Sequence, residues 1–332
     1  MKISRVLIGL LVSCAAWSVS AQTIIKFSHV VAVDTPKGQA SLFFAKRAGE
    51  LTKGKVKVEV YANSSLYKDK EEMEALQIGS VQMLAPSTSK FGPLGVKEFE
   101  ALDLPFIFDD TDDLHKVTAG PIGVALMAKL EPKGIHGLAF WDNGLKVFTA
   151  NTPLKMPADY KGKKFRIQSS KVLDEMIRSV GGIPQVLAFS EVYQALQTGV
   201  VDGQENSPSN IYTQKMHEVQ KHLTITNHGY LGYAVIANKK FWDGLPADVR
   251  GQLEQAMKEA TVYANQLAQK DNDDALAGIK NSGKTIIYVP TKEKRLALKK
   301  AMVTVHAKMT DRIGKDILQQ IYKATGFDPT KL

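Results

Sequence analysis

The sequence predicts an α/β fold of two lobes, with a ligand cleft between the lobes and a long helix that crosses both. Three observations lead to this prediction. Strand and helix patterns alternate from residue 24 onward, the alternation begins again near residue 164, and one amphipathic helix pattern runs from about residue 246 to 282. Such alternation is typical of a parallel sheet with helices on both faces.

The first lobe begins with a β-α-β-α-β run. Asp34 or Thr35 can cap a helix with Pro36 in its first position, and Gly54 ends that helix. Valines at every second position predict the next strand. The expected elements are strands at 24–28, 56–60 and 83–85, and helices at 36–52 and 68–78.

The same order of elements returns in the second half. The expected elements are a strand at 164–168, a helix at 172–180, a helix capped by Ser190 that ends at 197–199, and a short strand that begins at Val200. The segments ALQIGSV (75–81) and ALQTGVV (195–201) share five of seven residues, although helix ends can also match by chance. A true repeat would put Ser87 and Asn206 at equivalent strand exits beside one cleft.

The long helix pattern at 246–282 would be about 55 Å long, more than one small domain needs. We therefore expect it to lie across both lobes, with a possible kink at the polar segment 270–274. A strand at 285–289 and two amphipathic helices follow. No Pro- or Ser-rich linker separates the halves, so several chain crossings should join them.

Residues 1–21 are predicted to be a signal peptide. Lys2 and Arg5 precede the apolar segment 6–16, and Val19-Ser20-Ala21 offers a cleavage point before Gln22. The alternative is a lipid on Cys14, because LVSC resembles a lipobox. We expect export to the periplasm. Cys14 is the only cysteine, so no disulfide, catalytic thiol or cysteine-based metal site is expected.

Enzyme motifs are weak in this chain. Residues 278–285 (GIKNSGKT) fit the phosphate-loop pattern, but a helix enters the loop and a strand leaves it, the reverse of what phosphate binding requires. The seven histidines form no H-E-x-x-H motif, and no G-x-S-x-G motif occurs. We expect no enzyme activity, no catalytic residue, no metal and no cofactor. The net charge of +9 comes from scattered lysines, so nucleic acid is not an expected partner.

The segment KGKKFRIQSS (161–170) raises the question of the binding site. Phe165 and Ile167 share one face of the predicted strand and Arg166 lies on the other. Considered alone, Arg166 is better explained as a solvated surface charge.

Six segments carry a resemblance to a known family. The chain resembles the periplasmic substrate-binding proteins of tripartite ATP-independent periplasmic (TRAP) transporters, the DctP branch. The segments are FSHVVAVDTPKGQA (27–40), QMLAPSTSKFG (82–92), DNGLKVFTAN (142–151), YKGKKFRIQSS (160–170), AFSEVYQALQTGVVDGQEN (188–206) and YLGYAVIANKKFWDGLP (230–246).

The resemblance implies a two-lobed periplasmic binding protein fold. The expected lobes are residues 22–144 plus 232–272 and residues 145–231 plus 273–332. It also implies that Arg166 holds a ligand carboxylate through its guanidinium fork, with Asn206 beside it and Phe189 as an aromatic wall.

The resemblance also suggests how the far end of the ligand is held. Lys146 and Ser87 depart from the pattern of the sialic-acid members, which favours a smaller, doubly anionic ligand. Lys37 is a candidate partner for the second carboxylate, with a solvated lysine as the alternative, and His29 could line the cleft.

The function expected from this resemblance is capture of a four-carbon dicarboxylate, such as succinate, malate or fumarate, by a monomer that delivers it to the TRAP membrane permease. Alternatives are a uronate or another sugar acid, an aromatic or branched acid, a sensory role on a receptor, and an exported hydrolase or lyase.

Overall fold

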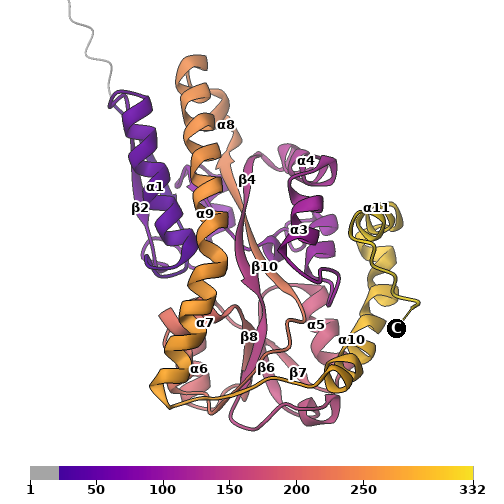
Figure 1. Ribbon diagram of the computed structural model, residues 1–332. Coiled ribbons are helices and arrows are strands. Elements are labelled where there is room, and N and C mark those ends of the chain that lie inside the picture. Colours follow the sequence, from indigo (N-terminus) through magenta and orange to yellow (C-terminus); the bar gives the residue numbers. More distant parts are fainter. Residues whose placement is uncertain (1–21, 332) are drawn as a thin grey trace, which may run out of the picture.

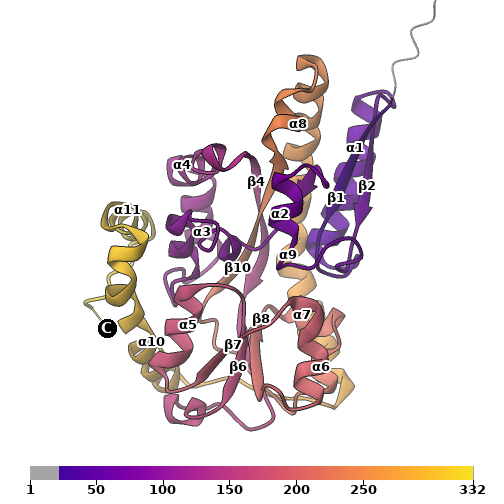
Figure 2. The ribbon, with the colours of Figure 1, turned by 180° about the vertical axis from the view of Figure 1, so that it is seen from behind.

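The computed structural model describes residues 22–331, which form two β-sheets with helices packed around them (Figures 1 and 2). The first sheet has the order β2-β1-β3-β10-β4. Its strands are β1 (Thr23–Ser28), β2 (Val56–Tyr61), β3 (Met83–Leu84), β4 (Ile135–Leu145) and β10 (Tyr230–Asn238). Strand β1 pairs in parallel with β2 and β3, whereas β10 runs antiparallel to β3 and β4. The sheet is therefore mixed rather than wholly parallel, because β10 returns from the other sheet.

The second sheet has the order β11-β9-β5-β8-β6-β7. Its strands are β5 (Val147–Ala150), β6 (Lys164–Ile167), β7 (Ile183–Val186), β8 (Gly203–Asn206), β9 (His222–Thr224) and β11 (Ile286–Tyr288). Strand β6 is parallel to both of its neighbours, β7 and β8. The carboxyl ends of β6 and β8 thus leave the sheet on the same edge, as in other open α/β sheets.

Eleven α-helices complete the part of the chain that the structure describes. The helices are α1 (Pro36–Leu51), α2 (Glu72–Gln77), α3 (Thr111–Thr118), α4 (Pro121–Ala128), α5 (Lys171–Ser179), α6 (Val192–Gln197), α7 (Pro208–Thr213), α8 (Lys239–Asp243), α9 (Ala247–Ser282), α10 (Lys292–Ile313) and α11 (Lys315–Thr325). The predicted two-lobed α/β architecture is confirmed.

Two chain crossings between the sheets lie side by side. Only Lys146 separates β4 of the first sheet from β5 of the second, and residues 225–229 lead back from β9 to β10. The Lys146 amide donates a hydrogen bond to the Gly229 carbonyl at 2.8 Å, which ties the two crossings together. The predicted lobe boundaries at 144 and 231 lie next to these crossings.

Helix α9 is the third connection, and it is continuous over 36 residues. It packs on α1 and β4 of one lobe and on α7 of the other (Figure 1). The polar segment 270–274 does not break it, because Asn272 is buried and accepts a hydrogen bond from the Ser209 amide at 3.0 Å. The helix ends at Gly283, whose φ of 66° is left-handed, and β11 follows. The helix-before-strand order expected for residues 278–285 is confirmed.

Three local expectations were wrong. The second helix begins at Glu72, because residues 68–71 form a turn first. Ser190 does not cap α6, because residues 189–191 form a 3₁₀ turn and Glu191 precedes the helix. The strand that follows begins at Gly203 rather than Val200, since residues 198–202 make the turn.

The C-terminal helices connect the lobes from the outside. Helix α10 packs on α5, and α11 packs on α3 and α4. His306 on α10 is buried, and its Nε2 donates to the Pro105 carbonyl at 2.8 Å while its Nδ1 accepts from the Tyr322 hydroxyl at 2.8 Å. The neutral ring satisfies both contacts, and burial favours it by lowering the pKa of His306.

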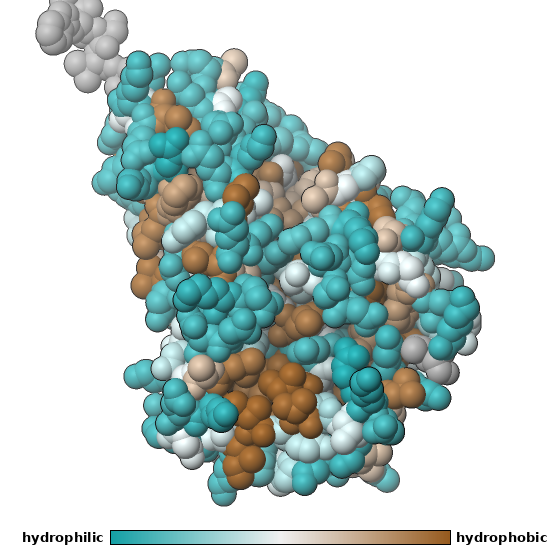
Figure 3. Space-filling model, in the orientation of Figure 1, coloured by the Kyte–Doolittle hydropathy of each residue, from teal (hydrophilic) through white to brown (hydrophobic). Residues whose placement is uncertain are grey.

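Within residues 22–331, no helix is long and apolar enough to cross a bilayer. The face seen in Figure 3 is mainly hydrophilic, with an apolar area in its lower part. The predicted signal peptide, with Cys14, lies outside the described residues.

We predict that His306 makes the protein less stable in acid. Burial lowers the pKa of His306 from 6.5 to about 4. The unfolded chain therefore binds the proton first, and the free energy of unfolding should fall as pH drops from about 6.5 to 4, by about 1.4 kcal/mol per pH unit for this one group.

The measurement is urea unfolding of wild type and His306→Gln from pH 8 to 4.5. The variant should be less stable at pH 8 but should lose less stability on acidification. An equal pH slope in the two proteins would contradict the prediction.

Candidate functional site

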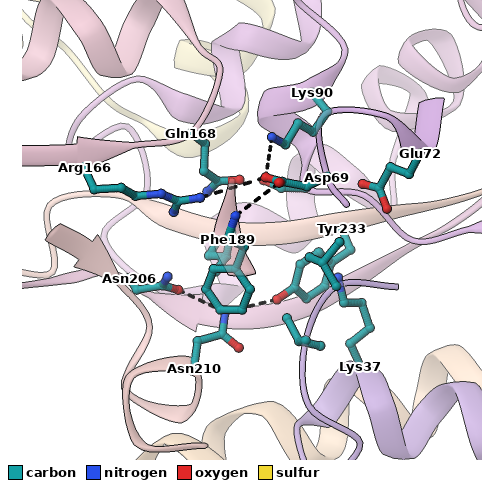
Figure 4. Close-up of a pocket in the computed structure, with 14 residues that line it drawn as sticks. Lys37, Asp69, Glu72, Lys90, Arg166, Gln168, Phe189, Asn206, Asn210 and Tyr233 are labelled. Carbon is teal, nitrogen blue, oxygen red and sulfur yellow. Dashed lines mark hydrogen bonds and ion pairs between the residues drawn. The ribbon is translucent and has the colours of Figure 1, made fainter. Parts of the chain in front are cut away.

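A small cavity lies between the two lobes. We call it the interlobe cavity. The first lobe contributes Val30, Val31, Lys37, Asp69, Glu72, Ser87, Lys90, Leu231 and Tyr233, and the second contributes Arg166, Gln168, Phe189, Asn206 and Asn210. Charged and amide groups converge there from both lobes (Figure 4).

Arg166 stands on β6, in the second lobe, and its side chain is only 1% exposed. Its Nε and Nη2 donate to the Leu187 carbonyl at 3.1 and 3.0 Å, which fixes the plane of the guanidinium. The Phe189 ring lies 5.7 Å from its central carbon. Nη1 and one Nη2 hydrogen donate to no described residue, so an edge of the fork is available to a ligand.

Asp69 links the two lobes at the cavity (Figure 4). Its carboxylate accepts hydrogen bonds from the Lys90 ammonium at 2.7 Å and from the Phe189 amide at 3.1 Å, and it lies 3.9 Å from Arg166 Nη2. Burial alone would raise the pKa of Asp69, but Lys90 and Arg166 outweigh burial and hold it below its usual value. Asp69 is therefore ionised at neutral pH.

Asn206 ends β8 with its amide in the cavity wall. Its Oδ1 accepts from the Ser207 amide at 3.0 Å and from Asn210 Nδ2 at 2.9 Å. With the oxygen so occupied, the Nδ2 group remains a donor. Asn210 Nδ2 also lies 3.4 Å from the Tyr233 hydroxyl, which carries this network to the first lobe.

Lys37 enters the cavity from the first turn of α1 and is 1% exposed. Its Nζ donates to the Ala85 carbonyl at 2.8 Å and lies 3.6 Å from the centre of the Tyr233 ring. Burial lowers the pKa of Lys37 to about 7, against the opposing effect of Glu72 and Asp69. Lys37 is thus not a solvated surface lysine.

Five of the seven candidate residues line the interlobe cavity: Lys37, Ser87, Arg166, Phe189 and Asn206. Ser87 and Asn206 follow turns in which Gly79 and Gly199 have φ of 82° and 73°, so the two segments share this backbone feature.

The other two candidates do not reach the cavity wall. Lys146 is 1% exposed, and its ammonium is held 2.9 Å from the buried carboxylate of Glu205. His29 is fully buried, and neither ring nitrogen has a hydrogen-bond partner among the described residues. Burial lowers the pKa of His29 to about 3, with nearby Lys37 acting in the same direction, so the ring is neutral.

Six polar residues of the cavity were not predicted from the sequence: Asp69, Glu72, Lys90, Gln168, Asn210 and Tyr233. Lys90 and Gln168 lie inside quoted family segments, and Asp69 follows the exit of β2. The positions of these three residues in the sequence could have indicated a place in the site. Tyr233 also lies inside a quoted segment, whereas Asn210 reaches the site only through the packing of α7.

Comparison with known proteins shows the family to which the chain belongs. The family model for bacterial extracellular solute-binding protein, family 7 (DctP) matches residues 27–313. The C4-dicarboxylate-binding periplasmic protein DctP of Rhodobacter capsulatus is 58% identical over 330 residues, which covers 97% of this chain and 99% of that protein.

Solved structures show the same architecture. A TRAP periplasmic solute-binding protein from Shewanella oneidensis with bound succinate matches with a TM-score of 0.90 and 41% identity, over 92% of this chain and 100% of that one. The sugar-acid-binding protein DctPAm of Advenella mimigardefordensis, in complex with galactonate, matches with a TM-score of 0.89 and 31% identity, over 92% and 98%. The chain therefore belongs to the bacterial extracellular solute-binding proteins of family 7, the DctP family.

Proposed function

We propose that this chain captures a four-carbon dicarboxylate such as succinate, malate or fumarate and delivers it to the membrane permease of a TRAP transporter. One observation carries the proposal. Two buried cations from different lobes, Arg166 and Lys37, line one small cavity, and the rings of Phe189 and Tyr233 line the same space (Figure 4). Cations at both ends with apolar surface between them suit a short dianion.

Arg166 supplies the first carboxylate site. The free edge of the guanidinium can donate two parallel hydrogen bonds to one carboxylate, a geometry that a lysine cannot reproduce. Asn206 Nδ2 adds a neutral donor on the same side. Because both groups sit at the carboxyl ends of neighbouring strands, the sheet itself fixes their spacing.

The second carboxylate site lies in the first lobe. Lys37 supplies a charge there, and the Ser87 hydroxyl and Lys90 line the same wall. Binding this carboxylate requires both lobes to approach, so the ligand favours the closed arrangement. Exclusion of water from the closed cavity strengthens each ion pair.

The apolar part of the cavity wall favours a dicarboxylate over a sugar acid. A sugar acid presents several hydroxyl groups, each of which needs a polar partner when buried. Part of the wall is formed by the apolar side chains of Val30, Val31 and Leu231, which offer no such partner. The galactonate-bound relative supports the alternative ligand class, and it is the less similar of the two solved structures compared above.

We further propose that export removes residues 1–21. The apolar segment 6–16 and the small residues before Gln22 support cleavage by a signal peptidase. The chain would then act as a free monomer in the periplasm.

Replacement of Arg166 should remove most of the affinity for succinate. Arg166→Ala leaves the ligand carboxylate without its buried partner and should cost about 2–5 kcal/mol, or roughly 30-fold to several thousand-fold in Kd. Arg166→Lys keeps the charge but loses the fork, and should give an intermediate loss. Isothermal titration calorimetry measures both.

Arg178→Lys is the matched control, because Arg178 lies on the exposed side of α5 and pairs with Asp174 at the surface. Its affinity should equal that of wild type. Normal succinate binding by Arg166→Ala would refute the anchor role.

Lys37→Met should discriminate between dianions and monoanions. The variant keeps the volume of the side chain but removes the second cation, so succinate affinity should fall about ten- to a hundredfold. Any weak binding of butyrate, which lacks the second carboxylate, should change little. Equal losses for the two acids would place Lys37 outside the ligand site.

The mature protein should begin at Gln22. Intact-mass measurement of the periplasmic fraction should show a chain that lacks residues 1–21 and carries no lipid, with the same mass for Cys14→Ser. A lipid-modified chain that begins at Cys14 would support the alternative.

A further inference from the structure

Glu72 is a buried acid that the protein leaves without a partner. It lies in the first turn of α2, lines the interlobe cavity and is 1% exposed. Neither carboxylate oxygen accepts a hydrogen bond from any described residue. Figure 4 shows its carboxylate directed into the space that Asp69 and Lys37 also border. Ionisation of a carboxylate in such a place costs free energy, because the group loses its hydration and accepts no hydrogen bond in exchange.

The nearby cations have other partners. Lys90 from the turn after β3 binds Asp69 at 2.7 Å, and Lys37 from α1 binds the Ala85 carbonyl and the Tyr233 ring. Their positive charges favour an ionised Glu72 from a distance, and the charge of Asp69 opposes it.

Two more titratable groups border this region. Arg166 faces the cavity from β6 and lies nearer to Asp69 than to any other described carboxylate. His29 at the exit of β1 is neutral. Burial is the largest effect on Glu72 and raises its pKa to about 7, so its charge changes near neutral pH.

The charge balance of the cavity depends on Glu72 and on Lys37, because burial brings the pKa of each to about 7. With the arginine and both lysines protonated, the three cations Lys37, Lys90 and Arg166 face the two carboxylates Asp69 and Glu72. If Glu72 is ionised, the cavity carries one net positive charge. If Glu72 is neutral, the cavity carries two, which matches a ligand with two negative charges.

We propose that Glu72 meets the bound dicarboxylate as a neutral carboxylic acid, so that binding of the dianion brings one proton into the cleft. This inference rests on the proposed function. The proton comes from solvent, forms an O–H bond on the Glu72 carboxylate, and is donated as a hydrogen bond to a carboxylate oxygen of the ligand. Two ionised carboxylates in contact would instead repel each other in a cavity with little water.

A pH dependence follows, with a definite sign. The ligand complex holds the proton at Glu72, whereas the free protein loses it as pH rises through neutrality. Succinate affinity should therefore fall between pH 7 and 8.5, by at most about tenfold per pH unit for one linked proton. Succinate itself stays a dianion throughout this range.

The experiment is calorimetric titration of the full mature chain with succinate at pH 8, in several buffers that differ in their enthalpy of ionisation. The dependence of the observed heat on the buffer gives the number of protons taken up. Wild type should take up close to one proton more than Glu72→Gln, because any uptake by Lys37 is common to the two proteins. Glu72→Gln is neutral at every pH and keeps a donor, so it should take up fewer protons and bind succinate at pH 8 at least as tightly as wild type.

Glu74→Gln is the matched control, because Glu74 is exposed on the same helix. It should behave as wild type in proton uptake and affinity. Wild type alone gives a second readout, the decrease of succinate affinity between pH 7 and 8.5, which does not depend on any variant.

Four results would overturn the inference. Equal proton uptake by wild type and Glu72→Gln would place the proton on another group, Lys37 first. A tenfold or larger loss of affinity in Glu72→Gln would show that the ligand needs the ionised carboxylate of Glu72 as a hydrogen-bond acceptor. The hydroxyl group of malate is an example of a ligand group that would donate to it. Binding without proton uptake and with flat pH dependence would leave the proposed function intact and remove this inference alone. Absence of binding to any dicarboxylate would overturn both.

Discussion

The arrangement of the site depends on one buried cation, the guanidinium of Arg166. Burial lowers its pKa, yet an arginine remains charged in a protein, so its charge must be compensated where it stands. The chain supplies only part of that compensation, through the Leu187 carbonyl and the carboxylate of Asp69 at 3.9 Å. Asp69 belongs to the other lobe, so the need of this cation for an anion also draws the lobes together. In our proposal, a ligand carboxylate takes over that compensation at closer range and with better geometry.

The fold makes such a partly compensated cation tolerable. Arg166 stands on the strand between β7 and β8, where pairing on both sides holds its backbone. The two crossings at Lys146 and Gly229, and the unbroken helix α9, join the lobes without a flexible linker. A rigid connection of this kind restricts the lobes to a hinge-like approach, because independent movement would break the hydrogen bonds between the crossings. The buried pair of Lys146 and Glu205 lies beside one crossing and contributes to that rigidity.

In our proposal, binding and closure are the same event. Each lobe brings at least one cation to the cavity, Arg166 from the second lobe and Lys37 and Lys90 from the first. Such groups are costly to bury alone, and a dianion relieves the cost in both lobes at once. In our proposal, the same reasoning applies to the acid next to them, Glu72, whose protonation would adjust the net charge of the cavity to that of the ligand.

The sequence by itself determined the α/β class, the two halves and the long helix, and its family resemblance indicated five of the residues that line the cavity. Strand and helix periodicity, glycine stops and the Thr35-Pro36 start are local signals, and local signals survive without tertiary contacts. The tertiary structure decided the rest. Lys146 bears the same kind of charge as Lys37, yet a partner on β8 turns it into a structural ion pair. Asp69 and Glu72 stand three positions apart, and only packing makes one an ionised bridge between the lobes and the other a buried acid without a partner. Burial and the identity of the nearest charge determine those roles, and both depend on residues distant in the chain.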